Sequence, residues 1–293
     1  MMYCRASFRV MRGNIMSKKN GLPDQFKLAA TLSAELNPSS PVIMAGEPAG
    51  RIALASRLGY DSLELHWSDP SRIPLDQIAV ACSDHQMDIS AFATGRAYVQ
   101  EGLSLTHEDE NNRAAAIARL KSFVDAASPY HATVIIGCIR GNLASEASRS
   151  RSLELLANST RMVAEYADEK GVGIVFEAIN RYENNYLNTA EETASFIRNF
   201  QLPNTKILLD TFHMNIEDKD MAKAVLDCGN LLGYIHIADS NRRYTGEGHI
   251  QMKEIVEALI KVGYNGVLSA ECLPLPDSDT ALAGWIEGIK KAF

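Results

Sequence analysis

The sequence contains the stretch Gly173-Ile-Val-Phe-Glu-Ala-Ile-Asn-Arg-Tyr-Glu183, in which an apolar run ends in one carboxylate and a second carboxylate follows. The β-forming residues between Gly173 and Asn180 predict a short strand that is buried on both faces. A charged Glu177 at the end of such a strand must be paired, hydrogen-bonded or bound to a cation, because leaving a carboxylate desolvated costs about 3–5 kcal/mol. We therefore expect its partner elsewhere in the chain.

Short β-rich runs alternate with longer segments of helical period from Phe26 onward. Eight such runs predict strands, at residues 26–33, 62–66, 89–93, 133–139, 174–179, 206–212, 234–238 and 267–272. Continuous apolar strands that alternate with helices indicate a parallel sheet covered by helices. We therefore predict an α/β fold, a (β/α)8 TIM barrel. A doubly wound open sheet is the alternative, but no GxGxxG or Walker loop follows any strand.

Helix-end signals agree with this alternation. Thr189-Ala-Glu-Glu192 is typical of a capping box, and Pro74 is expected in the first turn of a helix. Three glycines fall just past expected helix ends, at Gly171, Gly229 and Gly263. One longer irregular stretch, residues 95–111, follows the third predicted strand and is expected to be either a lid over the active face or a plain surface loop.

We predict one domain, residues 26–293, because no linker or change of composition divides it. Residues 1–25 are basic, contain no acid before Asp24 and lack the apolar core of a secretion signal, so a disordered or mis-started extension is expected. No apolar run is long enough for a membrane span. The five cysteines form no CxxC pair, which favours small core residues in the reducing cytoplasm.

The composition favours small-molecule chemistry. Hydrophobic residues make up 46% of the 293 residues and charged residues 22%, as in an ordinary globular protein. The formal net charge of −7 argues against nucleic acid as a partner, since such proteins normally present a basic face.

Three later strands each carry a residue that can bind a metal at or near the carboxyl end, namely Asp210, His236 and Glu271. With Glu177, four consecutive strands present their side chains to one mouth of the barrel, where TIM barrels carry their chemistry. Three carboxylates and one imidazole would repel one another without a cation. This donor set suits one divalent ion, Mn²⁺ first, with Mg²⁺, Co²⁺ and Zn²⁺ as alternatives.

Further polar residues follow these strands closely. Glu183, His213 and Arg242 are expected to overhang the same mouth. Arg96 and Arg140, with Arg242 and Arg243, place several cations around the mouth, which favours a small molecule that carries an acid group as substrate.

The sequence resembles the ketose 3-epimerase branch of the xylose-isomerase-like TIM barrels, which includes D-tagatose and D-allulose (psicose) 3-epimerases. The resemblance covers nearly all of residues 26–293. Its most specific segments are Glu177-Ala-Ile-Asn-Arg-Tyr-Glu183, Leu209-Asp-Thr-Phe-His-Met-Asn-Ile216, His236-Ile-Ala-Asp-Ser-Asn-Arg242 and Glu271. The segments Gly102-Leu-Ser-Leu-Thr-His107, Val134-Ile-Ile-Gly-Cys-Ile-Arg-Gly141 and Glu271-Cys-Leu-Pro-Leu-Pro276 resemble the 5-keto-L-gluconate epimerase subgroup, although Arg96 stands where that subgroup is expected to carry a glutamine.

The resemblance implies a metal-dependent epimerase that inverts the carbon next to the carbonyl of a ketose or keto-uronate through an enediolate. It implies that Glu177, Asp210, His236 and Glu271 bind the metal, and that Glu177 and Glu271 also exchange the proton. It further implies that Glu183, His213 and Arg242 hold the carbonyl end of the substrate. We also expect a homo-oligomer.

The sequence is also compatible with other functions. An aldose–ketose isomerase, a hydroxypyruvate isomerase or an inosose dehydratase could use the same scaffold, metal and acids. A metal-dependent endonuclease would need a histidine-rich cluster and a basic face, which this chain lacks. A barrel that binds sugar without catalysis is the non-enzymatic alternative.

Overall fold

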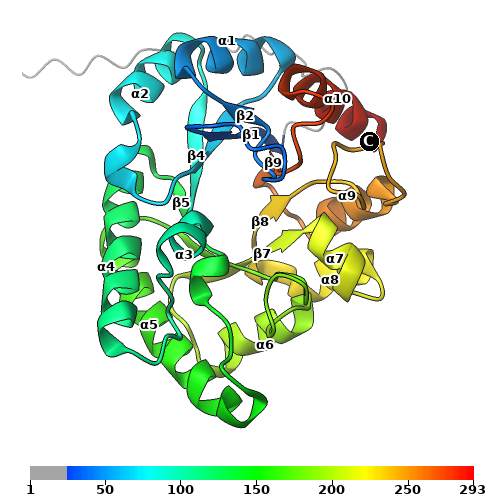
Figure 1. The fold of residues 1–293 in the computed structure, drawn as a ribbon. Helices are drawn as coiled ribbons and strands as arrows, with labels where there is room; N and C mark the ends of the chain where they lie inside the picture. Colours follow the sequence, from blue (N-terminus) through cyan, green and yellow to red (C-terminus); the bar gives the residue numbers. More distant parts are fainter. Residues whose placement is uncertain (1–24) are drawn as a thin grey trace, which may run out of the picture.

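The computed structural model of the chain describes residues 25–293, which form a ring of strands surrounded by helices (Figure 1). The strands are β1 (Lys27–Ser33), β2 (Met44–Ala45), β3 (Ser62–His66), β4 (Asp88–Ala93), β5 (Thr133–Ile136), β6 (Ile174–Glu177), β7 (Thr205–Asp210), β8 (Leu232–His236) and β9 (Val267–Ala270). The α-helices are α1 (Pro48–Leu58), α2 (Leu75–Asp84), α3 (Gly95–Glu101), α4 (Glu110–Ala127), α5 (Arg149–Glu169), α6 (Ala190–Asn199), α7 (Thr211–Glu217), α8 (Met221–Cys228), α9 (Met252–Lys261) and α10 (Ser278–Lys291). Short 3₁₀ helices are formed by Pro70–Arg72, Ser128–Tyr130, Cys138–Arg140, Glu146–Ser148 and Gly229–Leu231. The extension predicted for residues 1–25 lies, up to residue 24, outside the described residues.

Eight of the strands close into a parallel barrel. The order around the ring is β1, β3, β4, β5, β6, β7, β8, β9, and β9 pairs with β1 so that Ala270 lies opposite Ala30. The two-residue strand β2 pairs only with the end of β1. The α-helices cover the outside of the ring (Figure 1). This closure confirms the predicted (β/α)8 TIM barrel and excludes the open doubly wound sheet.

Each of the eight predicted strands is present, but five of them, predicted at 133–139, 174–179, 206–212, 234–238 and 267–272, end two or three residues earlier than predicted. The run at 133–139 stops at Ile136, and Cys138–Arg140 turns into a 3₁₀ helix. The run at 206–212 stops at Asp210, because this side chain accepts a hydrogen bond from the backbone N–H of Phe212 and caps α7. Residues beyond these points therefore belong to the mouth of the barrel and not to its wall.

The predicted irregular stretch at 95–111 was wrong in its first half. Residues Gly95–Glu101 form the helix α3, which ends at Gly102 with φ at +70°, a conformation that glycine adopts without strain. The segment that follows packs inward, since Leu105 is fully buried and its N–H donates to the carbonyl of Ile139. This part of the rim is thus anchored to the backbone between β5 and β6.

The predicted helix ends are mostly confirmed. Thr189 and Glu192 form the capping box, in which each side chain bonds the backbone N–H of the other. The three predicted glycines, Gly171, Gly229 and Gly263, all have positive φ. Pro74 differs slightly, because it occupies the position before the first turn of α2.

A small apolar cluster fills the barrel below its mouth. It consists of inward-facing residues from five strands, Ala91, Ala93, Ile135, Val175, Leu208 and Tyr234. Three of them stand two residues before Glu177, Asp210 and His236, and alternate residues of a strand share a face. The cluster therefore forms an apolar layer inside the barrel, directly beneath the polar residues at the strand ends.

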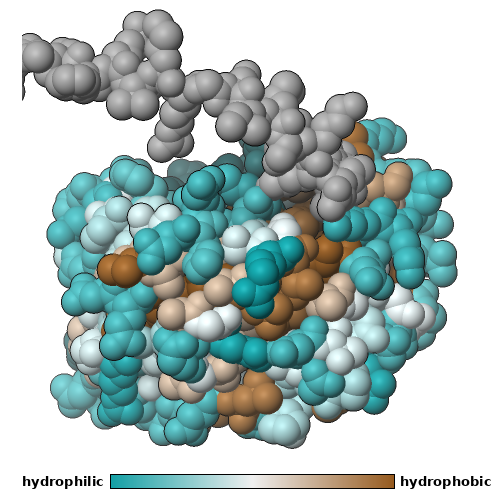
Figure 2. Space-filling model, turned by 90° about the horizontal axis from the view of Figure 1, so that it is seen from above, coloured by the Kyte–Doolittle hydropathy of each residue, from teal (hydrophilic) through white to brown (hydrophobic). Residues whose placement is uncertain are grey.

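The face of the molecule that is seen from above in Figure 2 is mainly polar. Figure 2 shows teal polar side chains over most of the face seen from above, with apolar ones gathered in a strip between them. Within residues 25–293, no helix is both long and apolar enough to cross a membrane.

Candidate metal centre and active site

Four side chains meet at the carboxyl ends of consecutive strands. Glu177 ends β6, Asp210 ends β7, His236 ends β8, and Glu271 directly follows β9. One potential ligand atom from each lies within 4.8 Å of the other three. All four residues are buried. The structure thus brings together the four residues that the sequence singled out, in an arrangement that could hold a metal ion.

The two nitrogens of His236 have different environments. Nε2 lies 3.1 Å and 3.2 Å from the two carboxylate oxygens of Glu64. Nδ1 has no hydrogen-bond partner although it is buried, and it lies 3.6 Å from Glu177 and 3.4 Å from Glu271. A buried nitrogen without a partner among carboxylates fits a metal ligand.

The buried carboxylates of the cluster repel one another, and this affects their pKa values. Burial raises the pKa of Glu177, and the charge of Glu271 adds to the rise. Burial also raises the pKa of Asp210 to about 8, although Arg242 opposes it. For Glu271 burial acts in the same direction, but the charges of His236 and Arg242 outweigh it and lower the pKa to about 2. A divalent cation would relieve this repulsion by replacing protons in the cluster.

The predicted substrate-holding residues stand next to the cluster. Arg242 donates to Glu271 at 2.5 Å and to Asp210 at 3.3 Å, and its Nη1 lies 3.8 Å from Glu183. The guanidinium also lies over the ring of Phe212, 4.6 Å from its centroid. These contacts hold the guanidinium group of Arg242 at the edge of the cluster.

His213 lies between the cluster and Glu183. Its Nε2 is 3.6 Å from Asp210 and 3.7 Å from Glu177. Its Nδ1 is 2.7 Å from the side-chain amide of Asn180, which also donates to Glu183 at 3.1 Å. Burial lowers the pKa of His213 well below its usual range, and Arg242 adds to the effect, so the ring is neutral at physiological pH.

Three polar residues of this site were missed from the sequence, namely Glu64, His66 and Asn180. Glu64 is fully buried and lies 2.7 Å from Nε2 of His66 as well as next to His236. Burial alone would raise the pKa of Glu64, but the charges of His236 and His66 and their hydrogen bonds outweigh it and lower the pKa. The signal was present in Ser62-Leu-Glu-Leu-His66, where a carboxylate and an imidazole share one face of a buried strand.

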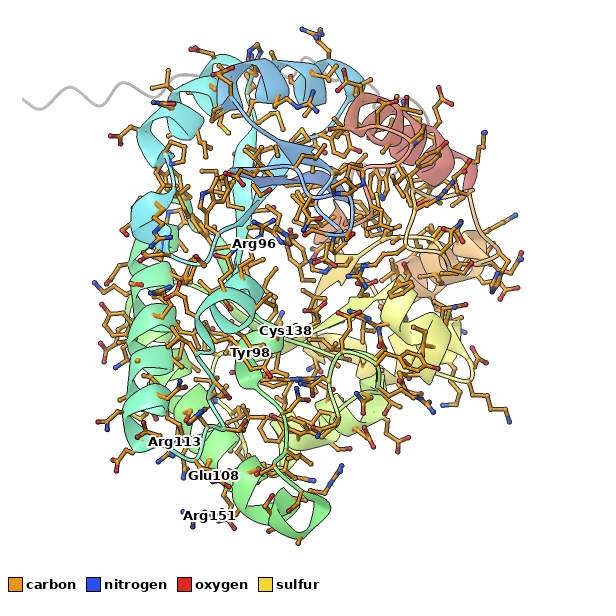
Figure 3. All side chains as sticks on the ribbon, viewed as in Figure 1. Arg96, Tyr98, Glu108, Arg113, Cys138 and Arg151 are labelled. Carbon is orange, nitrogen blue, oxygen red and sulfur yellow. The ribbon has the colours of Figure 1, made fainter. Side chains whose placement is uncertain are left out.

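Arg96 lies in the first turn of α3, the helix that follows β4. It is half-buried and makes no hydrogen bond or ion pair with the other described residues. Burial lowers the pKa of its guanidinium, which the charge of Glu35 partly offsets. Figure 3 shows Arg96 toward the centre of the ring, whereas Arg113 and Arg151 lie at its outer edge. Arg96 is therefore a partly desolvated cation without a hydrogen-bond or ion-pair partner among residues 25–293.

Arg140 differs from the expectation of a substrate contact. It is fully buried, and its guanidinium donates to the backbone carbonyls of Glu177, Tyr186 and Leu187. The same group lies over the rings of Phe176 and Tyr186. Arg140 thus holds the loop after β6 in place beneath the mouth.

Replacing Arg140 by Met is expected to lower the free energy of unfolding by on the order of 3 kcal/mol, because three buried carbonyls would lose their donor. Thermal unfolding should show a fall in Tm of about 5–10 °C. Arg151→Met, on the exposed surface of α5, is the matched control and should leave Tm nearly unchanged. An equal Tm for both variants would contradict the anchoring role.

The chain is similar to several known proteins. Residues 52–290 match the family described as xylose isomerase-like TIM barrel. The L-ribulose 3-epimerase of Methylomonas sp. (strain DH-1) is 33% identical over 227 residues, which cover 75% of this chain and 76% of that protein. The D-psicose 3-epimerase of Agrobacterium fabrum is 32% identical over 231 residues, which cover 75% of this chain and 77% of that protein. The solved structure of a D-allulose 3-epimerase from Methylomonas sp. in complex with D-allulose aligns with a TM-score of 0.78 and 25% identity, over 94% of this chain and all of that one.

Proposed function

Because the chain belongs to the ketose 3-epimerase family of the xylose isomerase-like TIM barrels, we propose that it inverts the carbon next to the carbonyl of a ketose or keto-uronate. The observation that carries the proposal is the buried cluster of three carboxylates and one imidazole, which includes one glutamate at the end of β6 and another directly after β9. An epimerase needs two such groups, because a proton must leave one face of a carbon and return to the other.

Glu177, Asp210, His236 and Glu271 hold one divalent cation in this proposal, with Mn²⁺ as the first choice and Mg²⁺, Co²⁺ or Zn²⁺ as alternatives. When bound, such an ion polarises the ketone and stabilises the negative charge of an enediolate. The unpartnered Nδ1 of His236 and the crowded carboxylates support this assignment.

Glu177 and Glu271 move the proton. Their carboxylates approach Nδ1 of His236 from β6 and from the end of β9, so they can flank a substrate bound between them. One carboxylate takes the proton from carbon, and the carboxyl group of the other gives a proton to the opposite face. Which glutamate acts first depends on the epimer that is bound.

Glu183, His213 and Arg242 hold the carbonyl end of the substrate. Their mutual contacts keep a neutral imidazole, a carboxylate and a guanidinium beside the two glutamates. Hydrogen-bond donors that are fixed in advance stabilise a developing oxyanion without further reorganisation.

The most direct test is proton NMR of a Mn²⁺-loaded enzyme with ketoses and keto-uronates in D₂O, read after the metal is removed. Epimerisation places deuterium on the inverted carbon and leaves the carbonyl in place. Movement of the carbonyl would favour an aldose–ketose or hydroxypyruvate isomerase, and loss of water would favour a dehydratase. Failure of every substrate to exchange its C–H would leave a sugar-binding barrel and reject the proposal.

The substrate class follows from the two halves of the mouth. The proposed proton carriers belong to β6 to β9, while Arg96 stands beside β4 on the other half. A sugar bound by its carbonyl at the first half extends its far end toward the second. We therefore propose a keto acid whose carboxylate, at the end remote from the ketone, pairs with Arg96.

Arg96→Gln is expected to lower kcat/KM for such a 5-ketohexonate by about 10–100-fold, the worth of a hydrogen bond between charged groups. The matched 2-ketohexose, which carries CH₂OH in place of the carboxylate, should be affected far less. Arg151→Gln removes the same charge from an exposed position and serves as the control. A preference of the unaltered enzyme for the neutral sugar would reject the assignment of Arg96.

A homo-oligomer in the cytoplasm remains part of the proposal. Tyr182 is 81% exposed and Val99 is 75% exposed, and both follow strands at the carboxyl end of the barrel. A subunit contact at this rim would shield such side chains from water. Light scattering of the purified protein gives the oligomeric state directly.

A further inference from the structure

Glu64 is a buried residue whose carboxylate contacts a histidine on the far side of the barrel interior. It lies in β3, the neighbour of β1, whereas His236 ends β8, the neighbour of β9. The strands β1 and β9 separate them around the ring, so the contact of 3.1 Å between Glu64 and Nε2 of His236 spans the inside. The side chain of Glu64 is completely shielded from solvent.

The partners of Glu64 are two imidazoles. Its Oε1 lies 2.7 Å from Nε2 of His66, and both of its oxygens lie within 3.2 Å of Nε2 of His236. An ionised carboxylate only accepts hydrogen bonds. Both Nε2 atoms must therefore carry a proton, and a neutral His236 then presents the lone pair of Nδ1. That lone pair faces Glu177 and Glu271.

We infer that Glu64, itself held by His66, is a positioning residue that fixes His236 as the Nε2–H tautomer with Nδ1 directed at the cation. The inference rests on the proposed function only in assuming that a cation occupies the cluster. Carboxylates that orient metal-ligating histidines raise the affinity of such sites, and their loss costs about 10–100-fold in metal binding.

A second cation between Glu64, His66 and Glu271 is the competing arrangement, because ligand atoms of these three residues also lie within 4.8 Å of one another. The hydrogen bond between Glu64 and His66 already satisfies both groups. The number of ions per chain separates the two arrangements, since positioning requires one ion and the competing site requires two.

Glu64→Gln is the decisive variant. A glutamine amide has no charge, and it can accept through only one of the two positions that the carboxylate oxygens occupy around Nε2 of His236, because its NH₂ group donates. We expect the Kd for Mn²⁺, measured by electron paramagnetic resonance of the free ion, to rise about 10–100-fold. At saturating Mn²⁺, kcat should recover most of its value, whereas a change in kcat with an unaltered Kd for Mn²⁺ would overturn the inference.

Two controls make the test specific. Glu108→Gln removes a carboxylate from an exposed loop at the outer edge of the ring (Figure 3) and should leave the Kd for Mn²⁺ unchanged. His66→Gln, which leaves the contact between Glu64 and His236 intact, should weaken Mn²⁺ binding less than Glu64→Gln does. Binding of two Mn²⁺ ions per chain in the unaltered protein would overturn the inference.

A second measurement does not depend on the variant being folded. In the unaltered protein loaded with diamagnetic Mg²⁺, imidazole ¹⁵N shifts report which nitrogen of His236 carries the proton. A protonated Nε2 and an unprotonated Nδ1 are expected, and the opposite tautomer would overturn the inference. If the protein bound no divalent ion, the metal centre of the proposed function would fall, whereas the opposite tautomer in protein that does bind Mg²⁺ would overturn the inference on Glu64 alone.

Discussion

Glu271→Gln is expected to lower kcat/KM for epimerisation by about 10³-fold or more, because the variant lacks a group that can exchange a proton with carbon. Glutamine has nearly the shape of glutamate, so the barrel should remain folded. The loss has a second cause, since the hydrogen bond of 2.5 Å that Arg242 donates would no longer have a charged acceptor. The expected deficit therefore appears in kcat more than in KM.

The measurement combines initial rates with deuterium uptake from solvent. Glu177→Gln should be equally impaired, because both faces of the carbon need a carboxyl group. Glu183→Gln, next to the cluster but outside the proposed ligand set, should mainly raise KM. Substantial turnover by Glu271→Gln at saturating Mn²⁺, with circular dichroism like that of the unaltered protein, would remove Glu271 from the acid–base pair.

Removal of divalent ions should abolish turnover completely, and addition of Mn²⁺ should restore it. The same treatment should lower the thermal stability, because the buried carboxylates of Glu177, Asp210 and Glu271 then repel one another. An ion at one hundred times its Kd adds about 2.7 kcal/mol to the stability of the folded state, which corresponds to a rise in Tm of about 5–10 °C.

Dialysis against a chelator, followed by scanning calorimetry at stepwise Mn²⁺ concentrations, measures both effects on one sample. Asp210→Ala, which lacks one of the four proposed ligands, is the control and should respond weakly to Mn²⁺ in both assays. Full activity in protein that elemental analysis finds free of metal would contradict the proposed site.

The barrel could be predicted from the sequence because its strands are short and continuously apolar, and because charged residues mark their carboxyl ends. Glu177, Asp210 and His236 are each the last residue of a strand, so a local pattern was enough to place them at one rim. Parallel strands have no freedom to place these ends elsewhere. The predicted metal cluster therefore needed no knowledge of long-range contacts.

The residues that were missed or misplaced depend on such contacts. Glu64 looked like part of an ordinary strand, because its contact with His236 depends on how β3 and β8 face each other across the ring. Arg140 looked like a cation for substrate, since the sequence does not show that the chain turns into a 3₁₀ helix after Ile136 and buries its side chain. Charge can be counted from a sequence, but the direction of a side chain depends on the backbone around it.

The pairing of β1 with β9 has a consequence for synthesis on the ribosome. Glu271 follows the final strand of the barrel, and Glu64 comes from the second strand of the ring. A nascent chain that has emerged only as far as β8 carries three of the proposed ligands but neither the closing strand nor the fourth. The centre can therefore mature only after β9 has left the ribosome, so ion capture marks a completely translated barrel.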